Sequence, residues 1–260
     1  MKPRMAIRPG EIFFFYTFLD RAGDREMEHW AGHLSADEAD KAQTFSLEKK
    51  KREFLVSRAL VRFVLSECSG LLPSELTFFQ NRHGKPELKT AGTGLRFSLS
   101  HSGNMVACGI ARDRNLGIDV EDTNRNVNLA IADRFFRGPE INWIREPVPR
   151  AEHESRDRFL RIWTLKEAYI KARGKGLSMP LNLFSFGFCQ GVPSVCFDES
   201  MDDAPESWSF YSFDLCGYKA AAALQFPCDQ HSRLKILHCI PFQRTDPECI
   251  LSHFQKPLFP

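Results

Sequence analysis

Two long stretches of helically spaced apolar residues, each ended by glycine, constrain the fold of this chain most. The first covers residues 47–68 and stops at Gly70, and the second is expected to begin near Asp157 and to stop at Gly174. Each is followed by segments with the alternating pattern of strands, so the chain carries a weak internal repeat. This pattern predicts an α+β fold built from two similar α/β halves.

The predicted strands suggest where the two halves meet. Residues 105–111 and 116–120 have strand patterns and are joined by a short polar turn, which is typical of a β-hairpin. We place the boundary in this turn, so that residues 1–114 form the N-terminal half and residues 115–260 the C-terminal half. Residues 146–156 contain two prolines and are expected to form a mobile loop.

Composition limits the function classes that fit. With 260 residues, 43% of them apolar, the chain can bury a full core. Its formal net charge of +2 arises from 35 basic and 33 acidic residues, which does not favour nucleic acid or an anionic membrane as a partner. The cysteines have no C-x-x-C spacing, which argues against zinc. The apolar run at residues 12–19 is too short for a signal peptide, so we interpret it as a buried strand and expect a cytoplasmic protein with reduced cysteines.

The segment from Trp163 to Leu177 is the strongest candidate for a site of chemistry. Glu167 and Lys171 are four residues apart and share one helix face, which makes the pair either an ordinary surface ion pair or part of an active site. The residues expected to face the core lie on a different face; they are Leu165, Ala168, Tyr169 and Ala172.

A second acidic pair precedes this helix. Asp119 and Glu121 lie two residues apart on a predicted strand, so their side chains point to the same side. Together with Glu167 they provide three oxygen ligands of the kind that Mg²⁺ prefers, and Mg²⁺ commonly serves phosphate chemistry. The alternative is that both carboxylates lie at an exposed strand end.

Several basic residues are candidates for holding phosphate. Lys171 and His101 would suit this role, although a lone histidine in a turn is more often structural. Lys85 lies in a turn and is expected to be exposed. The basic run at residues 49–52 is either a solvated helix face or a phosphate-binding site. No segment matches G-x-x-x-x-G-K-[ST], so a P-loop nucleotide site is not expected.

Four motifs in this chain, taken in order, resemble those of the 4'-phosphopantetheinyl transferases. The matched core runs from about residue 45 to residue 177, and the four motifs together are far more specific than any one of them. The motifs are Gly84-Lys85-Pro86, F-S-L-S-H-S-G at 97–103, G-I-D-V-E at 117–121 and W-T-L-K-E-A-Y-I-K-A-R-G-K-G-L at 163–177. In particular, the chain resembles the larger surfactin-type members. The resemblance implies two similar α/β subdomains related by pseudo-twofold symmetry, each a small antiparallel sheet packed with a long helix.

The resemblance also implies an activity. It is the Mg²⁺-dependent transfer of 4'-phosphopantetheine from coenzyme A to a serine hydroxyl of an apo acyl or peptidyl carrier protein, with release of adenosine 3',5'-bisphosphate. By motif position the metal ligands are Asp119, Glu121 and Glu167, with Mn²⁺ as an alternative metal. Glu167 is the expected base, and Lys171 is expected to stabilise the diphosphate and its leaving group. The residues matched to, or nominated for, coenzyme A binding are Lys41, Lys49, Arg52, Lys85, Ser100, His101 and Lys171.

Two other functions are compatible with the same residues. A metal-dependent phosphohydrolase could use the three carboxylates with water in place of the serine. A non-catalytic protein could bind an acidic partner through residues 49–52 and the helix that bears Lys166 and Lys171. In the transferase hypothesis, Lys166 is also a candidate for docking an acidic carrier protein. We expect the chain to be a monomer with pseudo-dimeric halves.

Overall fold

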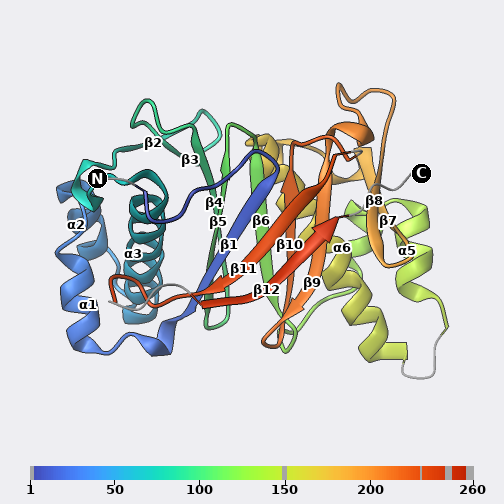
Figure 1. Cartoon of the computed structure of the whole chain (residues 1–260). Helices are drawn as coiled ribbons and strands as arrows, with labels where there is room; N and C mark the ends of the chain where they lie inside the picture. The colour runs from blue at the N-terminus through green and yellow to red at the C-terminus, as the bar shows by residue number, and fades with distance from the viewer. Residues whose placement is uncertain (1–2, 148–150, 229, 244–247, 256–260) are drawn as a thin grey trace.

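The computed structural model describes residues 3–147, 151–228, 230–243 and 248–255, and it places two stacked sheets between helices (Figure 1). The strands are β1 (Glu11–Phe18), β2 (Phe78–Gln80), β3 (Pro86–Leu88), β4 (Leu95–Ser102), β5 (Met105–Arg112), β6 (Leu116–Asp122), β7 (Phe184–Cys189), β8 (Val192–Phe197), β9 (Ser209–Leu215), β10 (Tyr218–Leu224), β11 (Ser232–His238) and β12 (Glu248–Gln255). The α-helices are α1 (Asp24–Ala31), α2 (Ala36–Gln43), α3 (Glu48–Ser69), α4 (Ile131–Phe135), α5 (Gly138–Arg145) and α6 (Ala151–Arg173).

The larger sheet has five strands in the order β12-β11-β1-β5-β4, and α3 covers one of its faces. Phe13 and Phe15 of β1 pack in the same core cluster as Leu60 and Val64 of α3. This helix ends at Gly70, whose φ of 77° is the left-handed conformation that glycine adopts without strain. The first long apolar stripe is therefore the helix that the sequence predicts.

The smaller sheet has the order β6-β10-β9 and is antiparallel throughout. Its outer face packs against α6, where Ala221 and Ala223 of β10 share a core cluster with Leu165 and Tyr169 of the helix. Small side chains on the strand allow the helix to approach the sheet closely. The predicted core face of the second long helix is buried as expected.

The inner faces of the two sheets share a third core cluster. Phe14 of β1 lies in it with Ile118 and Val120 of β6. The order of layers is thus α3, the five-stranded sheet, the three-stranded sheet and α6 (Figure 1). Because side chains alternate along a strand, burying Ile118 and Val120 between the sheets turns Asp119 and Glu121 toward α6. The predicted α+β fold with two helix-and-sheet halves is confirmed.

Three local predictions were wrong. Strands β5 and β6 do not form a hairpin, because β5 pairs with β1 and β4, whereas β6 pairs with β10. The five-stranded sheet is not wholly antiparallel, since β11 lies parallel to β1. Helix α6 begins at Ala151, so the second part of the predicted mobile loop at residues 146–156 is helical; residues 148–150 lie outside the described residues.

The C-terminal strands return to the sheet where the chain began. β11 and β12 extend the five-stranded sheet beyond β1, so residues 232–238 and 248–255 complete a sheet to which the N-terminal half contributes β1, β4 and β5. This sheet contains strands from both sides of the proposed boundary between residues 114 and 115. The boundary therefore stays a prediction. Within the described ranges, no helix has both the length and the apolar content needed to cross a membrane.

Candidate active site

The candidate site forms where the edge strand of one sheet meets the edge strand of the other. β4 and β6 are not joined by a backbone ladder. Instead, three serine hydroxyls on alternate residues of β4 accept hydrogen bonds from backbone N–H groups on alternate residues of β6. The pairs are Ser98 with Ile118 at 3.1 Å, Ser100 with Val120 at 3.2 Å and Ser102 with Asp122 at 3.0 Å. We call these residues the serine row; they connect the two sheets beside the acidic pair of β6.

Asp119 is buried in this junction, with only 5% of its surface exposed. Its Oδ1 atom accepts hydrogen bonds from Ser100 Oγ at 2.8 Å and from Lys171 Nζ at 2.7 Å. Its Oδ2 atom is buried and has no hydrogen-bond partner among the described residues. Glu121 is 8% exposed, so the alternative of two carboxylates at an exposed strand end is wrong.

Glu121 is held from two sides. Its Oε2 atom accepts a hydrogen bond from Ser102 Oγ at 2.9 Å, and its Oε1 atom forms an ion pair with Arg125. Arg125 follows the strand and was not singled out in the sequence, although its i+4 spacing from Glu121 is visible there. Each carboxylate of β6 therefore bonds to a serine of β4 and to one positively charged side chain, Lys171 for Asp119 and Arg125 for Glu121.

Glu167 of α6 completes the acidic group. Burial, followed by the negative charge of Asp119, raises the pKa of the Glu167 carboxyl to about 7, while Lys171 opposes the shift and Glu121 adds to it. The Glu167 carboxyl therefore lies within the electrostatic influence of both strand carboxylates and of Lys171. The structure thus brings together the three carboxylates and Lys171, as the spacing in the sequence suggested.

These residues fit a divalent cation. A buried carboxylate oxygen of Asp119 lacks a partner, and neighbouring negative charge disfavours the ionised form of Glu167. Oxygen-rich, negatively charged groups of this kind suit Mg²⁺ or Mn²⁺. In the part of the chain that the structure describes, no three acidic, histidine or cysteine side chains already surround one point. Lys171 and Arg125 lie against the strand carboxylates instead.

The close approach of α6 to β6 depends on Gly117, the first residue of the G-I-D-V-E motif. A Cβ atom added to this glycine would lie 1.9 Å from the carbonyl oxygen of Ala168 and 2.4 Å from the backbone nitrogen of Ala172. No side chain other than hydrogen fits between strand and helix at this point. Gly117 therefore allows the helix that carries Glu167 and Lys171 to rest directly on the strand that carries Asp119.

Lys85 is less exposed than the sequence predicts. Its Nζ atom donates to the carbonyl oxygens of Leu116, at 3.1 Å, and of Lys171, at 2.6 Å, so it binds the last turn of α6. Burial lowers its pKa to about 8. It also lines a pocket of about 250 Å³ together with Phe97, Leu99, Lys171 and Gly176. The prediction of an exposed Lys85 was wrong, because the turn at residues 81–86 folds onto the helix end.

His101 lies beside the first turns of α3, the helix that begins with the basic run at residues 49–52. His101 is half exposed, and its Nε2 atom lies 2.8 Å from Glu53 Oε1 of α3. Lys49 and Lys41 are exposed, and the Lys41 ammonium lies 5.7 Å from the centre of the Phe54 ring.

Arg52 behaves differently from its basic neighbours. Its guanidinium donates hydrogen bonds to the carbonyl oxygens of Leu19, at 3.0 Å, and of Ala22. These contacts attach the start of α3 to the segment that follows β1. Arg52 therefore has a visible structural role in addition to any part in phosphate binding.

Lys166 does not face solvent, and the hypothesis that it docks an acidic partner was wrong. Its side chain is fully buried, its Nζ atom lies 3.0 Å from Glu140 Oε2, and it donates to the carbonyl oxygens of Leu181 at 2.9 Å and Phe184 at 2.5 Å. Burial lowers its pKa to about 8, against the opposing charge of Glu140. Lys166 ties α5 and the segment before β7 to α6.

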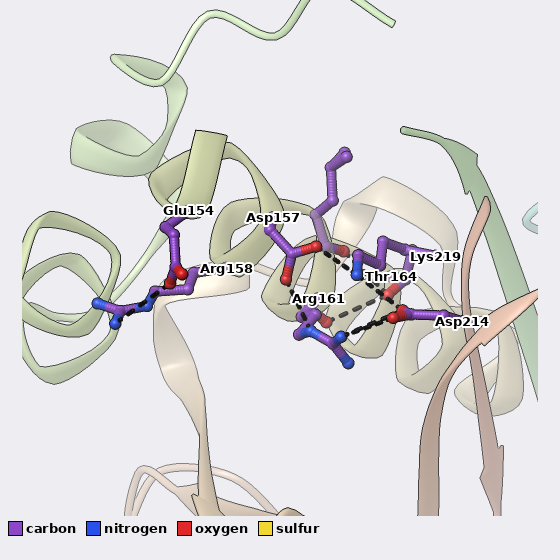
Figure 2. Close-up of polar contacts among 8 residues, drawn as sticks. Glu154, Asp157, Arg158, Arg161, Thr164, Asp214 and Lys219 are labelled. Carbon is purple, nitrogen blue, oxygen red and sulfur yellow. Dashed lines mark hydrogen bonds and ion pairs between the residues drawn. The ribbon is translucent and has the colours of Figure 1, made fainter. Parts of the chain in front are cut away.

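An ion network at the N-terminal part of α6 was not predicted. Figure 2 shows Asp157 and Arg161 of the helix facing Lys219 and Asp214 of the β9–β10 hairpin. Arg161 donates to Asp157 at 2.9 Å and to Asp214 at 3.0 Å, and Lys219 donates to Asp214 at 2.7 Å. Lys219 is directly opposite Glu121 in the strand register. Only the i,i+4 spacing of Asp157 and Arg161 could have signalled this network in the sequence.

Two family models match consecutive parts of this chain, and both describe the family that the four motifs resemble. Residues 115–224 match the family model described as "4'-phosphopantetheinyl transferase superfamily", and residues 21–112 match "4'-phosphopantetheinyl transferase, N-terminal". The chain is 32% identical over 212 residues to 4'-phosphopantetheinyl transferase Sfp of Bacillus subtilis, a match that covers 81% of this chain and 91% of that protein. This chain belongs to the 4'-phosphopantetheinyl transferase superfamily.

A second relative supports the same assignment for this phosphopantetheinyl transferase. The chain is 32% identical over 179 residues to 4'-phosphopantetheinyl transferase HetI of Nostoc sp., which covers 68% of this chain and 74% of that protein. The family resemblance seen in the four motifs is therefore confirmed, and the enzyme class is a phosphopantetheinyl transferase. The comparisons give no support to a phosphohydrolase.

Proposed function

We propose that this phosphopantetheinyl transferase moves 4'-phosphopantetheine from coenzyme A to a serine hydroxyl of an apo acyl or peptidyl carrier protein. The observation that carries the proposal is the meeting of Asp119, Glu121, Glu167 and Lys171 next to the pocket lined by Lys85. Family membership supports the same reaction. The carboxylates can bind a cation and accept a proton, and the lysines can offset the negative charge of a diphosphate.

In the proposed reaction, the serine oxygen of the carrier protein bonds to the phosphorus that bears the pantetheine arm. The bond from that phosphorus to the bridging oxygen breaks, and the electron pair leaves with adenosine 3',5'-bisphosphate. Glu167 accepts the serine proton directly or through water. In the protein without a metal ion its pKa is about 7, and a base works best when its pKa lies near the working pH.

Lys171 and Lys85 are assigned to the coenzyme A diphosphate and its surroundings. Lys171 lies 2.7 Å from Asp119 Oδ1 and also lines the pocket, so its charge would lie between the carboxylates and a diphosphate bound in that pocket. We expect it to stabilise the negative charge that grows on the leaving group. Lys85 holds the end of α6 and borders the same pocket. We therefore assign it two roles, support of the helix and contact with coenzyme A.

Four residues near the start of α3 and at the end of β4 are proposed as further coenzyme A contacts. His101 is exposed beside α3 and is available for the 3'-phosphate, as are Lys41 and Lys49. Arg52 remains a candidate even though its guanidinium also binds two carbonyl groups. Mg²⁺, or Mn²⁺ in its place, would be held by the three carboxylates and would supply neutralisation of the diphosphate charge.

Mass spectrometry tests the proposed function directly. The protein is incubated with coenzyme A, Mg²⁺ and an apo carrier protein, and the carrier should gain the mass of one phosphopantetheine group. A carrier whose acceptor serine is replaced by alanine should gain none, and addition of a chelator should stop the reaction until Mg²⁺ is restored. Folded protein that modifies no carrier from fatty acid, polyketide or peptide synthesis would refute the proposal.

A further inference from the structure

The serine row of β4 does more than join the two sheets. Ser98, Ser100 and Ser102 repeat every second residue, which matches the two-residue repeat of the N–H groups that they receive from β6. Each hydroxyl replaces one backbone contact of an ordinary ladder. The acidic pair lies on β6 and the serines lie on β4, so the two strands contribute different parts of one site.

The hydrogen bonds of the serine row determine which group each serine hydroxyl can donate its proton to. A backbone N–H can only donate, so the serine oxygen accepts from it, and the one hydroxyl proton is then left to be donated elsewhere. Ser100 also accepts from Lys171 Nζ at 2.9 Å, and it donates to Asp119 at 2.8 Å. Ser102 donates to Glu121 at 2.9 Å. All three hydrogen-bonding positions of Ser100 are therefore filled by this protein's own groups.

We propose that Ser100 and Ser102 are positioning residues that orient Asp119 and Glu121 for a divalent cation. This inference rests on the proposed function and adds a role for β4 within it. Each carboxylate is bonded to a hydroxyl that is itself anchored to the next residue's amide on the same strand. These two bonds to β4 consequently exist only while the two sheets are docked.

Ser102 has the clearer effect of the two. Glu121 bonds to Arg125 through Oε1 and to Ser102 through Oε2. Among the described residues, loss of the hydroxyl therefore leaves Glu121 with the ion pair to Arg125 alone. Hydrogen bonds to metal-ligand carboxylates fix their geometry and strengthen metal binding. Removal of the Ser102 hydroxyl should therefore weaken metal binding more than it weakens the fold.

Ser98 provides a matched control within the same row. Like Ser100 and Ser102, it accepts a hydrogen bond from a backbone N–H of β6, that of Ile118. In the described part of the chain, however, it bonds to no carboxylate. The reason is that the residue before Ile118 is Gly117, which has no side chain. Ser98→Ala therefore removes a sheet-to-sheet hydrogen bond of the same kind without touching the acidic pair.

The test measures Mn²⁺ binding alone, by electron paramagnetic resonance of the free ion, in the protein without substrates. Ser102→Ala and Ser100→Ala should bind Mn²⁺ about 10- to 100-fold more weakly than wild type. Ser98→Ala should bind within about twofold of wild type, even where its melting temperature falls as much as theirs. Ser102→Thr, which keeps the hydroxyl, should restore most of the affinity. Ser102→Cys serves if the alanine variant does not fold, and its weak donor should leave the affinity low.

The outcomes separate this inference from the proposed function. Equal Mn²⁺ affinity in Ser102→Ala and Ser98→Ala, or an equal loss in both, would overturn the inference alone, because the serines would then act only by joining the sheets. Wild-type protein that binds no Mn²⁺ without substrates would overturn the inference, whereas transfer that continues in the presence of a chelator would overturn the metal dependence of the proposed reaction. Selective loss in Ser100→Ala and Ser102→Ala, with recovery in Ser102→Thr, is the result expected.

Discussion

Replacing Gly117 by alanine tests whether the active site depends on direct contact between α6 and β6. The new Cβ atom would lie 1.9 Å from the carbonyl oxygen of Ala168, and both this atom and the nearby nitrogen of Ala172 belong to the helix backbone. An ordinary C···O contact is about 3.3 Å, so strand and helix must separate by about 1.4 Å at this point. Glu167 and Lys171 are the sequence neighbours of the two helix residues that must move.

Two effects of Gly117→Ala should be measurable. Forcing a methyl group into a closed contact costs about 1–3 kcal/mol of unfolding free energy, which chemical denaturation can detect. A displacement of catalytic groups by about 1 Å can lower turnover by about 100-fold, so phosphopantetheine transfer should fall by that factor or more. Steady-state assays with coenzyme A and an apo carrier protein would measure the loss, and circular dichroism would show whether the fold is kept.

Gly187→Ala is the matched control for this prediction. Gly187 also lies in a strand, but its added Cβ atom would meet only Ser194 Oγ at 3.6 Å, an ordinary contact. This variant should keep wild-type stability within about 1 kcal/mol and wild-type turnover. If Gly117→Ala were as stable and as active as Gly187→Ala, the argument that Gly117 sets the position of α6 would be refuted.

Four further variants test other parts of the structure. Lys166→Met leaves Glu140 buried without its cation and should cost about 3–5 kcal/mol of unfolding free energy, with no added salt dependence of carrier binding; an exposed docking residue would give the opposite pattern. Burial alone would raise the pKa of Asp157, but its bonds to nearby cations lower it below the ordinary 3.8, so its stabilisation is present above that pH and is lost as the pH falls further. Asp157→Asn should therefore be less stable than wild type at pH 7, and the difference should shrink as the pH falls below 3.8, as measured by urea unfolding. Glu167 has a raised pKa, so its ionisation costs stability as the pH rises from 4.5 through about 7; metal-free Glu167→Gln should gain stability over wild type at pH 8 but not at pH 4, while losing most transfer activity. His101→Ala should impair use of coenzyme A far more than use of dephospho-coenzyme A; equal losses would contradict its assignment to the 3'-phosphate.

Local periodicity was a sound guide to the parts of the site. Alternation along a strand placed Asp119 and Glu121 on the same side, and helical spacing placed Glu167 and Lys171 on one face away from the core. Both predictions agree with the structure, in which these residues share one environment. The order of the motifs also predicted the family, which the comparisons confirm.

Periodicity failed where the outcome depended on which segments pack together. Lys166 lies in the same polar-rich helix as Lys171, yet it is buried against Glu140, while the turn around Lys85 folds onto the end of α6. Strands β5 and β6 follow each other closely in sequence but join different sheets. In each case the competing local structures have similar propensities, and the choice among them was made by contacts with distant segments.

The sequence by itself determined the residue types of the site and the face on which each would lie, because side-chain direction follows from the repeat of a strand or a helix. Only the tertiary structure decided that the serines of β4 would meet the acidic pair of β6, and that Gly117 would let α6 rest against that strand. These meetings depend on shape and on the burial of polar groups between segments far apart in the chain. Such terms become effective only when the sheets and helices are packed, so no local pattern reports them.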